Sequence, residues 1–207
     1  CCGVCDVNYK PECSECGGTE DCSSMIYECG DYSGNLYVAD NGTGEYTDNV
    51  GCEYDPLRNI QQAIDISSDG DTIFVSQGMY YENINFNGKK ISLIGENKET
   101  TIIDGLASGS VISFNNQENE NSLIENFTLT NGNVGNWGGG ILVDGASPTI
   151  NNVIIRNSSG GGHGGGVAIV NGGDPTIKNS KIFGNYANTG GGIYCWQSSA
   201  QFEYVEI

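Results

Sequence analysis

Basic residues are scarce in this sequence, and their scarcity limits the partners that the protein can have. The chain of 207 residues has 8 Lys and Arg against 26 Asp and Glu, with a single His, so its formal net charge is −18. Nucleic-acid binding needs a basic face that neutralises phosphates, so we expect no nucleic-acid partner. The same charge disfavours binding to anionic membrane surfaces.

Long apolar runs are absent as well. No stretch of 18 apolar residues occurs, so the sequence predicts no transmembrane segment. No charged region followed by an apolar stretch opens the chain, so we expect that any signal peptide has already been removed. The 32 glycines do not follow a G-X-Y period, which excludes a collagen-like triple helix.

Cysteine is nearly confined to the N-terminal quarter, where 8 of the 9 cysteines lie. Residues 1–34 have no apolar period, so we predict a loop-rich segment stapled by disulfides in an oxidising compartment. Zinc is the alternative, because Cys2-x-x-Cys5 and Cys13-x-x-Cys16 have a spacing compatible with a four-thiolate site. The disulfide candidates are Cys1, Cys2, Cys5, Cys13, Cys16, Cys22, Cys29 and Cys52.

A glycine triplet recurs at a fixed spacing in the second half of the chain. It reads GGGI at Gly138–Ile141, GGGV at Gly164–Val167 and GGGI at Gly190–Ile193, with 26 residues between successive copies. A fixed period of this length is typical of a solenoid, in which each repeat buries its apolar face against the next. Short β-rich runs between Gly, Asn and Asp predict an all-β solenoid over residues 35–207. We expect about six or seven coils, regular from about residue 122 and continuing beyond 207.

Alignment of the repeats predicts which side chains point into the core and stack on the next coil. The inward columns are Ile124, Ile150, Ile177 and Phe202; Phe127, Val153, Ser180 and Val205; Leu129, Ile155, Ile182 and Ile207; Ile141, Val167 and Ile193; and Val143, Ile169 and Cys195. This register predicts that Cys195 is a small buried hydrophobe. Asn126, Asn152 and Asn179 also align, with Tyr204 in the last coil, and predict a ladder of hydrogen-bonded amides.

The segment before the regular coils predicts a short strand and one helix. Residues 35–40 read as the strand, and a helix is expected over about 56–67, with Asp55 as its cap and Pro56 in its first turn. A single amphipathic helix ahead of a solenoid is suited to cover the open end of the stack. Its apolar face comprises Leu57, Ile60, Ala63 and Ile64.

The triplets, the Pro-Thr-Ile runs and the asparagines at turns resemble the repeats of large secreted bacterial surface proteins with a right-handed parallel β-helix. The stretch from LYVAD to TTIIDG resembles the entry coils of the pectin-lyase-like superfamily. This resemblance covers roughly residues 35–207 and implies a right-handed parallel β-helix. The superfamily mixes enzymes with binding and structural proteins, so the resemblance implies no single activity.

Two short motifs invite an enzymatic interpretation. Gly78-Met-Tyr-Tyr-Glu82 resembles the GxYxE segment of pectin methylesterases, but no run like the QDTL, DFIFG or LGRPW segments of those enzymes follows. Gly162-His163-Gly164 resembles the GHG of polygalacturonases, whose chemistry needs paired carboxylates. The aspartates of the regular coils, Asp144 and Asp174, flank turns, and turn chemistry explains them.

Polysaccharide lyases of this fold use a basic residue and calcium held by acids. Arg156, Lys178 and Lys181 are the bases of the regular coils, and Arg156 and Lys181 are expected nearly in register one coil apart. No cluster of acids accompanies them. A carbohydrate-active enzyme, lyase or hydrolase, with its site in coils outside this sequence is therefore the alternative function.

Aromatic residues near the triplets are candidates for a platform that binds sugar rings. They are Trp137, His163, Tyr194 and Trp196, with Tyr186 nearby, and packing at coil corners is the alternative interpretation. We predict a secreted bacterial protein of the extracellular space or cell surface with a structural or adhesive role. It is expected to be a fragment of a larger protein, assembly or filament, with polysaccharides, cell-surface glycans or further copies of itself as partners.

Calcium is compatible with the acidic residues Asp40, Glu45, Asp48 and Asp55, but their spacing matches no EF-hand. We therefore assign no metal ligand and expect no other cofactor.

Overall fold

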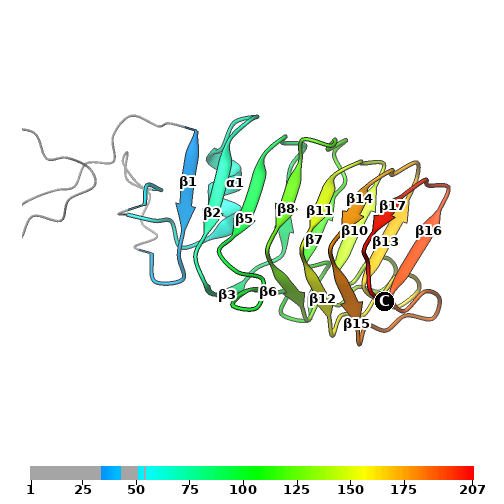
Figure 1. Cartoon of the computed structure of the whole chain (residues 1–207). Coiled ribbons are helices and arrows are strands. Elements are labelled where there is room, and N and C mark those ends of the chain that lie inside the picture. The colour runs from blue at the N-terminus through cyan, green and yellow to red at the C-terminus, as the bar shows by residue number, and fades with distance from the viewer. Residues whose placement is uncertain (1–33, 43–50, 54) are drawn as a thin grey trace, which may run out of the picture.

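The computed structural model describes residues 34–42, 51–53 and 55–207. These residues form a parallel β-helix, in which short strands stack coil upon coil in three sheets along one axis (Figure 1). All pairings between the named strands are parallel. The predicted parallel β-helix is confirmed.

Each sheet collects one strand from successive coils. The seven-stranded sheet contains, in spatial order, β1 (Asn35–Val38), β2 (Thr72–Val75), β5 (Ser92–Gly95), β8 (Leu123–Glu125), β11 (Thr149–Asn151), β14 (Thr176–Lys178) and β17 (Gln201–Glu203). The triplet sheet, whose later strands follow the glycine triplets, contains β4 (Ile84–Asn85), β7 (Ile112–Phe114), β10 (Ile141–Asp144), β13 (Val167–Val170) and β16 (Ile193–Trp196). The third sheet contains β3 (Gly78–Tyr81), β6 (Thr101–Asp104), β9 (Thr128–Thr130), β12 (Ile154–Arg156) and β15 (Lys181–Phe183).

The solenoid has about five complete turns in the described residues, fewer than the six or seven expected. The triplet sheet and the third sheet have five strands each, whereas the remaining sheet has seven. The difference arises at the two ends. After β1 the chain forms a helix where later coils form strands, and β17 is followed by a single bridge between Glu206 and Lys181.

The predicted register of the regular coils is confirmed. Ile150 pairs with Ile124 on one side and Ile177 on the other, and all three are fully buried. The expectation for Cys195 is wrong: it pairs with Ile169, as the repeat predicts, but it is exposed. Its strand β16 is the outermost strand of the triplet sheet, so no described coil covers its inward side.

The helix α1 (Ile60–Ile66) begins four residues later than predicted. Leu57, expected inside the helix, instead continues the first coil: its N–H donates to the carbonyl of Tyr37 at 2.8 Å, and its own carbonyl accepts from Ala39 at 2.9 Å. Helix propensity around Pro56 is therefore overridden by backbone pairing with β1. Ile60, Ala63 and Ile64 are buried, as their spacing predicts.

Both ends of α1 are held by charged side chains of the next coil. The Glu82 carboxylate accepts hydrogen bonds from the N–H groups of Ile60 at 2.8 Å and Gln61 at 2.9 Å. At the other end the Lys89 ammonium donates to the carbonyls of Ile64, Asp65 and Ser67 at 2.5, 2.8 and 2.7 Å. Each charge has the sign that opposes the helix dipole at its end.

The backbone conformation explains why asparagine occurs at the turns, and the sequence pattern did not predict this conformation. Asn126, Asn152 and Asn179 have φ of 67°, 51° and 53°, in the left-handed region that Asn tolerates better than most residues. Asn152 donates to Asn126 at 2.7 Å, as a ladder requires, but Asn179 donates to the side chain of Asn151. The amide ladder therefore shifts by one residue in the last coils.

The predicted cysteine-rich segment, residues 1–34, lies outside the described residues except for Gly34. Cys52 is the one disulfide candidate that is described, and it is not free. The disulfide framework and the zinc alternative therefore stay predictions. No helix of the described residues is long and apolar enough to cross a membrane.

Candidate functional site: an aromatic cluster on the triplet sheet

The glycine triplets bring the residues that precede them close to the outward side of the triplet sheet. Trp137, His163 and Thr189 form successive parallel bridges, so they stack in one column. The next residue of each coil is a glycine with φ between 64° and 68°, a backbone conformation that favours glycine. A Cβ on Gly138 would lie 2.5 Å from the carbonyl oxygen of Ile141, which shows how tightly the chain turns back on its own strand.

The four residues predicted as a platform come together in one aromatic cluster, which we define as Trp137, His163, Tyr194 and Trp196. The His163 ring stacks on Tyr194 with centroids 4.4 Å apart and 28° between the planes. The Trp137 ring meets His163, Tyr194 and Trp196 edge to face, with centroid distances of 5.8, 6.1 and 5.9 Å. These separations are those of favourable aromatic pairs.

A small residue on β13 lies in register beside this cluster. Ala168 aligns between Leu142 of β10 and Tyr194 of β16, and it is fully buried although it alternates with the inward-pointing residues. All four residues of β13 are buried, whereas outward positions of β10 are half-buried. The cluster therefore packs against the outward face of the triplet sheet. Trp196, which is 43% exposed, forms its solvent-facing edge.

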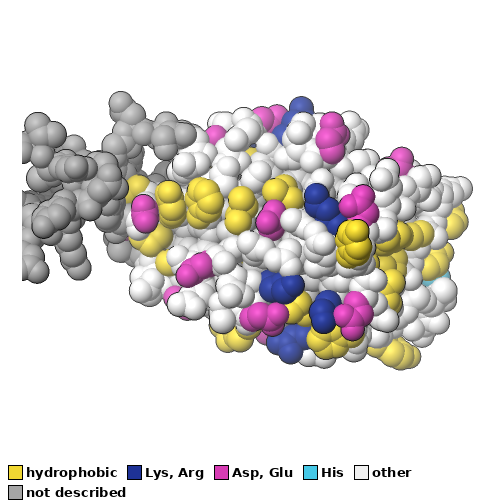
Figure 2. Space-filling view, viewed as in Figure 1, with side chains coloured by type: hydrophobic (Ala, Val, Ile, Leu, Met, Phe, Trp, Pro, Cys, Tyr) yellow, Lys and Arg dark blue, Asp and Glu magenta, His cyan; other side chains and the backbone are white. Residues whose placement is uncertain are grey.

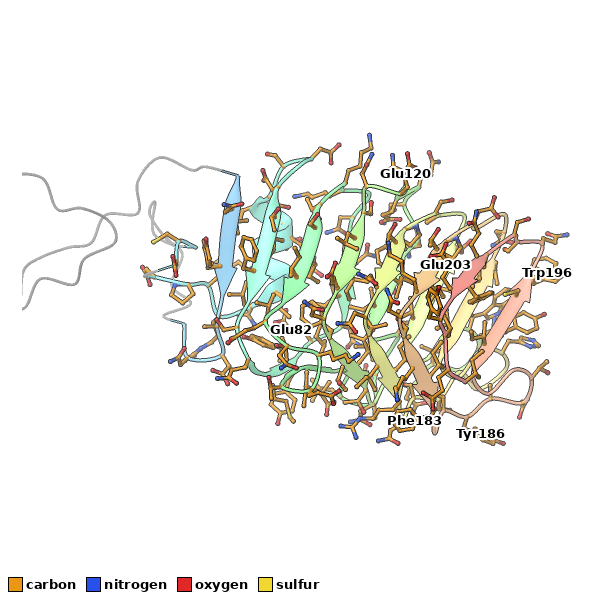
Figure 3. All side chains as sticks on the ribbon, in the orientation of Figure 1. Glu82, Glu120, Phe183, Tyr186, Trp196 and Glu203 are labelled. Atoms are coloured by element: carbon orange, nitrogen blue, oxygen red, sulfur yellow. The ribbon has the colours of Figure 1, made fainter. Side chains whose placement is uncertain are left out.

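Figure 3 shows Trp196 at the end of the solenoid opposite α1, well separated from Tyr186. Tyr186 forms a bridge with Ser159 in a turn of the chain before the triplet, and its side chain is 66% exposed. The structure therefore brings together the four candidates of the cluster and leaves Tyr186 apart.

The surroundings of His163 do not resemble an acid–base site. Its Nδ1 is buried without a hydrogen-bond partner among the described residues, and stacking on Tyr194 positions the ring. A catalytic histidine is usually oriented by a carboxylate. The aspartates of the regular coils are engaged in turns: Asp144 accepts from Asn171 at 2.7 Å, and Asp174 accepts from the N–H of Ser199 at 2.7 Å.

The Gly78–Glu82 segment has a structural explanation in this fold. Tyr80 points inward, is 3% exposed, and donates to the carbonyl of Ser76 at 2.9 Å. Glu82 holds the N-terminus of α1, and burial raises the pKa of its carboxyl group above the usual value, against hydrogen bonds from Gln61 and Ile60 that lower it. Both side chains that define the motif are therefore used for packing and helix capping.

The two bases singled out on the third sheet lie on neighbouring strands but at different register positions. Arg156 pairs with Phe183, and Lys181 pairs with Ile154, so the two bases are offset by two residues rather than aligned. Lys181 forms an exposed salt bridge with Glu206 at 3.0 Å. The two bases are therefore nearly in register, as expected, but they do not lie directly opposite each other.

Metal ligands do not gather in the part of the chain that the structure describes. No group of three or more His, Cys, Asp and Glu residues is placed to hold a metal ion there. Of the acidic residues considered for calcium, Asp40 and Asp55 are described, while Glu45 and Asp48 lie outside the described residues.

Sequence reasoning missed a groove on the outward face of the seven-stranded sheet. Tyr37 and Phe74 stack there with ring centroids 5.4 Å apart. The strands that supply these residues belong to the first, irregular coils, so no repeat in the sequence aligns them. Alternation within each strand marks Tyr37 and Phe74 as outward-facing, but their pairing depends on the fold.

Comparisons with known proteins assign the chain to no family. No family model and no curated protein matches the chain. Among solved structures, a pectin methylesterase from carrot is similar, with a TM-score of 0.46 and 13% sequence identity. The match covers 81% of this chain and 63% of that chain, so the chain corresponds to less than two thirds of the enzyme's length. Similarity at this level does not identify an activity.

Proposed function

We propose that the protein is an adhesive β-solenoid that binds carbohydrate through the aromatic cluster. One observation supports this proposal above the others: four aromatic side chains from three different coils meet on one outward face, and a half-exposed tryptophan lies at their rim. Sugar rings present apolar C–H faces that stack on such a surface, and Tyr and Trp add polar tips for hydroxyl groups.

The rigidity of the cluster also supports binding. Trp137 contacts three other rings, and His163 is fixed by stacking, so little side-chain freedom is lost when a ligand docks. A solenoid presents repeated faces, which suits weak multivalent contact with a polymer. An adhesive role follows from many such contacts acting together.

The wider context belongs to the same proposal. The protein acts outside the cell or on its surface, as part of a larger extracellular assembly, because the disulfides predicted for residues 1–34 need an oxidising compartment. The helix α1, which takes the place of strands in the first coil, covers the N-terminal end of the stack. Its contacts with β1, β2 and β4 support that role.

The proposal is tested by measuring glycan binding on an array and then by calorimetry with the strongest glycan. Trp196→Ala removes the exposed rim and is expected to weaken binding at least about ten-fold, the loss of one stacked aromatic. Tyr186→Ala is the matched control, since Tyr186 is a more exposed aromatic outside the cluster. Equal losses in both variants, or no glycan bound by the native protein, contradict the proposal.

The same preparations test the enzymatic alternative. They are incubated with polygalacturonate and its methyl ester, and released unsaturated products, reducing ends and methanol are measured. We expect no turnover above a heat-denatured control. Turnover that disappears in Arg156→Ala replaces the adhesive role with catalysis.

A further inference from the structure

A groove crosses the outward face of the seven-stranded sheet near its N-terminal end, far along the solenoid from Trp196. Its volume is about 520 Å³, within the range of sites that bind small ligands. Figure 2 shows a row of hydrophobic side chains over β1, β2 and β5 on this face. The lining residues used below are Tyr37, Glu53, Phe74, Ile94 and Glu96.

The floor of the groove is apolar and aromatic. Tyr37, Phe74 and Ile94 occupy the same register position on β1, β2 and β5, so their side chains form one outward column. The rings of Tyr37 and Phe74 stack, and Phe74 is 37% exposed. The column turns polar at the next coil, where Glu125 follows Ile94. This column of outward apolar side chains therefore ends at Ile94.

The walls of the groove carry negative charge. Glu53 and Glu96 are both exposed and line it. Glu96 is held in place by one oxygen, which accepts a hydrogen bond from the N–H of Gln77 at 2.9 Å, so its other oxygen is available. The basic residue that follows closely in the chain, Lys98, does not line the groove, and its ammonium donates to Asn152 at 2.5 Å.

No described base compensates these two carboxylates. The salt bridges among the described residues join Lys90 to Asp69 and Lys181 to Glu206, neither of which lines the groove. An aromatic floor flanked by carboxylates without salt bridges attracts an organic cation through two interactions. These are cation–π attraction to the ring faces and Coulomb attraction to the carboxylates. The overall charge of −18 draws cationic partners toward the protein from a distance.

We propose that this groove binds the lysine or arginine side chain of an extended basic segment from a partner protein. The cation lies over the Tyr37 and Phe74 rings, its aliphatic stem packs on Ile94, and its charge pairs with Glu53 and Glu96. This site lies on another sheet from the aromatic cluster and recognises a different chemistry. It is therefore independent of carbohydrate binding.

The test uses a fluorescent pentapeptide, Gly-Arg-Gly-Arg-Gly, and the same peptide with citrulline in place of arginine. Binding is followed by fluorescence anisotropy to the whole protein at low salt. Phe74→Leu keeps the apolar floor but removes the ring, and Glu96→Gln keeps an acceptor for Gln77 but removes the charge. Each is expected to weaken arginine-peptide binding about three- to five-fold.

Two matched variants keep the proposal falsifiable. Glu203→Gln removes an equal charge from β17 of the same sheet, outside the groove, and is expected to change binding less than about two-fold. Trp196→Ala should leave peptide binding unchanged. Equal effects of Glu203→Gln and Glu96→Gln mean attraction by net charge alone and overturn the proposal. Binding of the citrulline peptide as tight as that of the arginine peptide, or no effect of Phe74→Leu, overturns it too.

Discussion

The first coils and the glycine-triplet coils reach the same stacked geometry by different means. In the first coils long polar side chains cross between coils: Glu82 and Lys89 reach back to the two ends of α1. In the triplet coils the backbones of neighbouring coils come close together, and the N–H groups of Gly139, Gly140 and Gly165 each donate to the next coil. Charged side chains thus hold the helix of the first coils, whereas glycines without a side chain allow the close backbone approach at the triplets.

This difference predicts that the triplet coils are the more sensitive to added atoms. A Cβ at Gly166 would lie 2.5 Å from the carbonyl oxygen of Gly192 and 2.6 Å from a methyl carbon of Ile182, so two coils would have to separate. Gly166→Ala is therefore expected to lower the free energy of unfolding by about 3 kcal/mol, measured by urea denaturation. Gly135→Ala is the control because a Cβ there meets nothing within 4 Å. A small loss in Gly166→Ala would show that the coils separate easily.

The first coils should be more sensitive to the loss of a charge. Lys89→Met keeps the aliphatic stem but leaves the carbonyls of Ile64, Asp65 and Ser67 without the ammonium group. We expect a loss of about 2 kcal/mol in the free energy of unfolding, since hydrogen bonds to charged groups are the stronger ones. Lys90→Met removes only an exposed pair with Asp69 at 3.7 Å and should change it by less than about 0.5 kcal/mol. Equal losses of unfolding free energy in the two variants would show that the Lys89 contacts do not stabilise the protein more than an exposed salt bridge does.

The smallest expected effect is a dependence on pH at the other end of α1. Burial raises the pKa of Glu82, so the folded protein binds a proton more readily than the unfolded chain just above the usual carboxyl pKa. The contribution of Glu82 to stability is therefore greatest below that pKa and falls as pH rises through the raised one. Glu82→Gln does not titrate, so its stability deficit against the native protein should shrink as pH rises from about 4 to about 7.

Urea denaturation of both proteins across this pH range measures the deficit directly. A deficit that grows with pH would mean that the two hydrogen bonds from Ile60 and Gln61 outweigh burial.

Periodicity predicted the regular coils well because their register repeats in the sequence. Ile124, Ile150 and Ile177 pair as aligned. Periodicity did not predict contacts between coils of unequal length. Glu82 and Lys89 follow the helix residues they contact by more than 20 positions, and no sequence pattern near α1 indicates these contacts. The register of Cys195 was predicted correctly, but its burial was not, because burial there depends on a further coil stacking on β16.

The sequence predicted which residues form the candidate site but not how their rings are arranged. The positions before the triplets and on β16 single out Trp137 and Trp196. That Trp137 reaches rings two coils away follows from the tight turn at Gly138 and the small Ala168 between them. The groove at Tyr37 and Phe74 was not predictable, since its strands belong to coils with no shared period.

The contacts at the ends of α1 also set an order of assembly. The partners of both helix termini are synthesised after the helix itself, so a nascent chain that ends at Ser67 has neither Glu82 nor Lys89 to hold it. A helix of seven residues is too short to persist alone in water. The first coil must therefore wait for the second before it becomes stable. Each later coil, by contrast, finds a finished edge to which it can add.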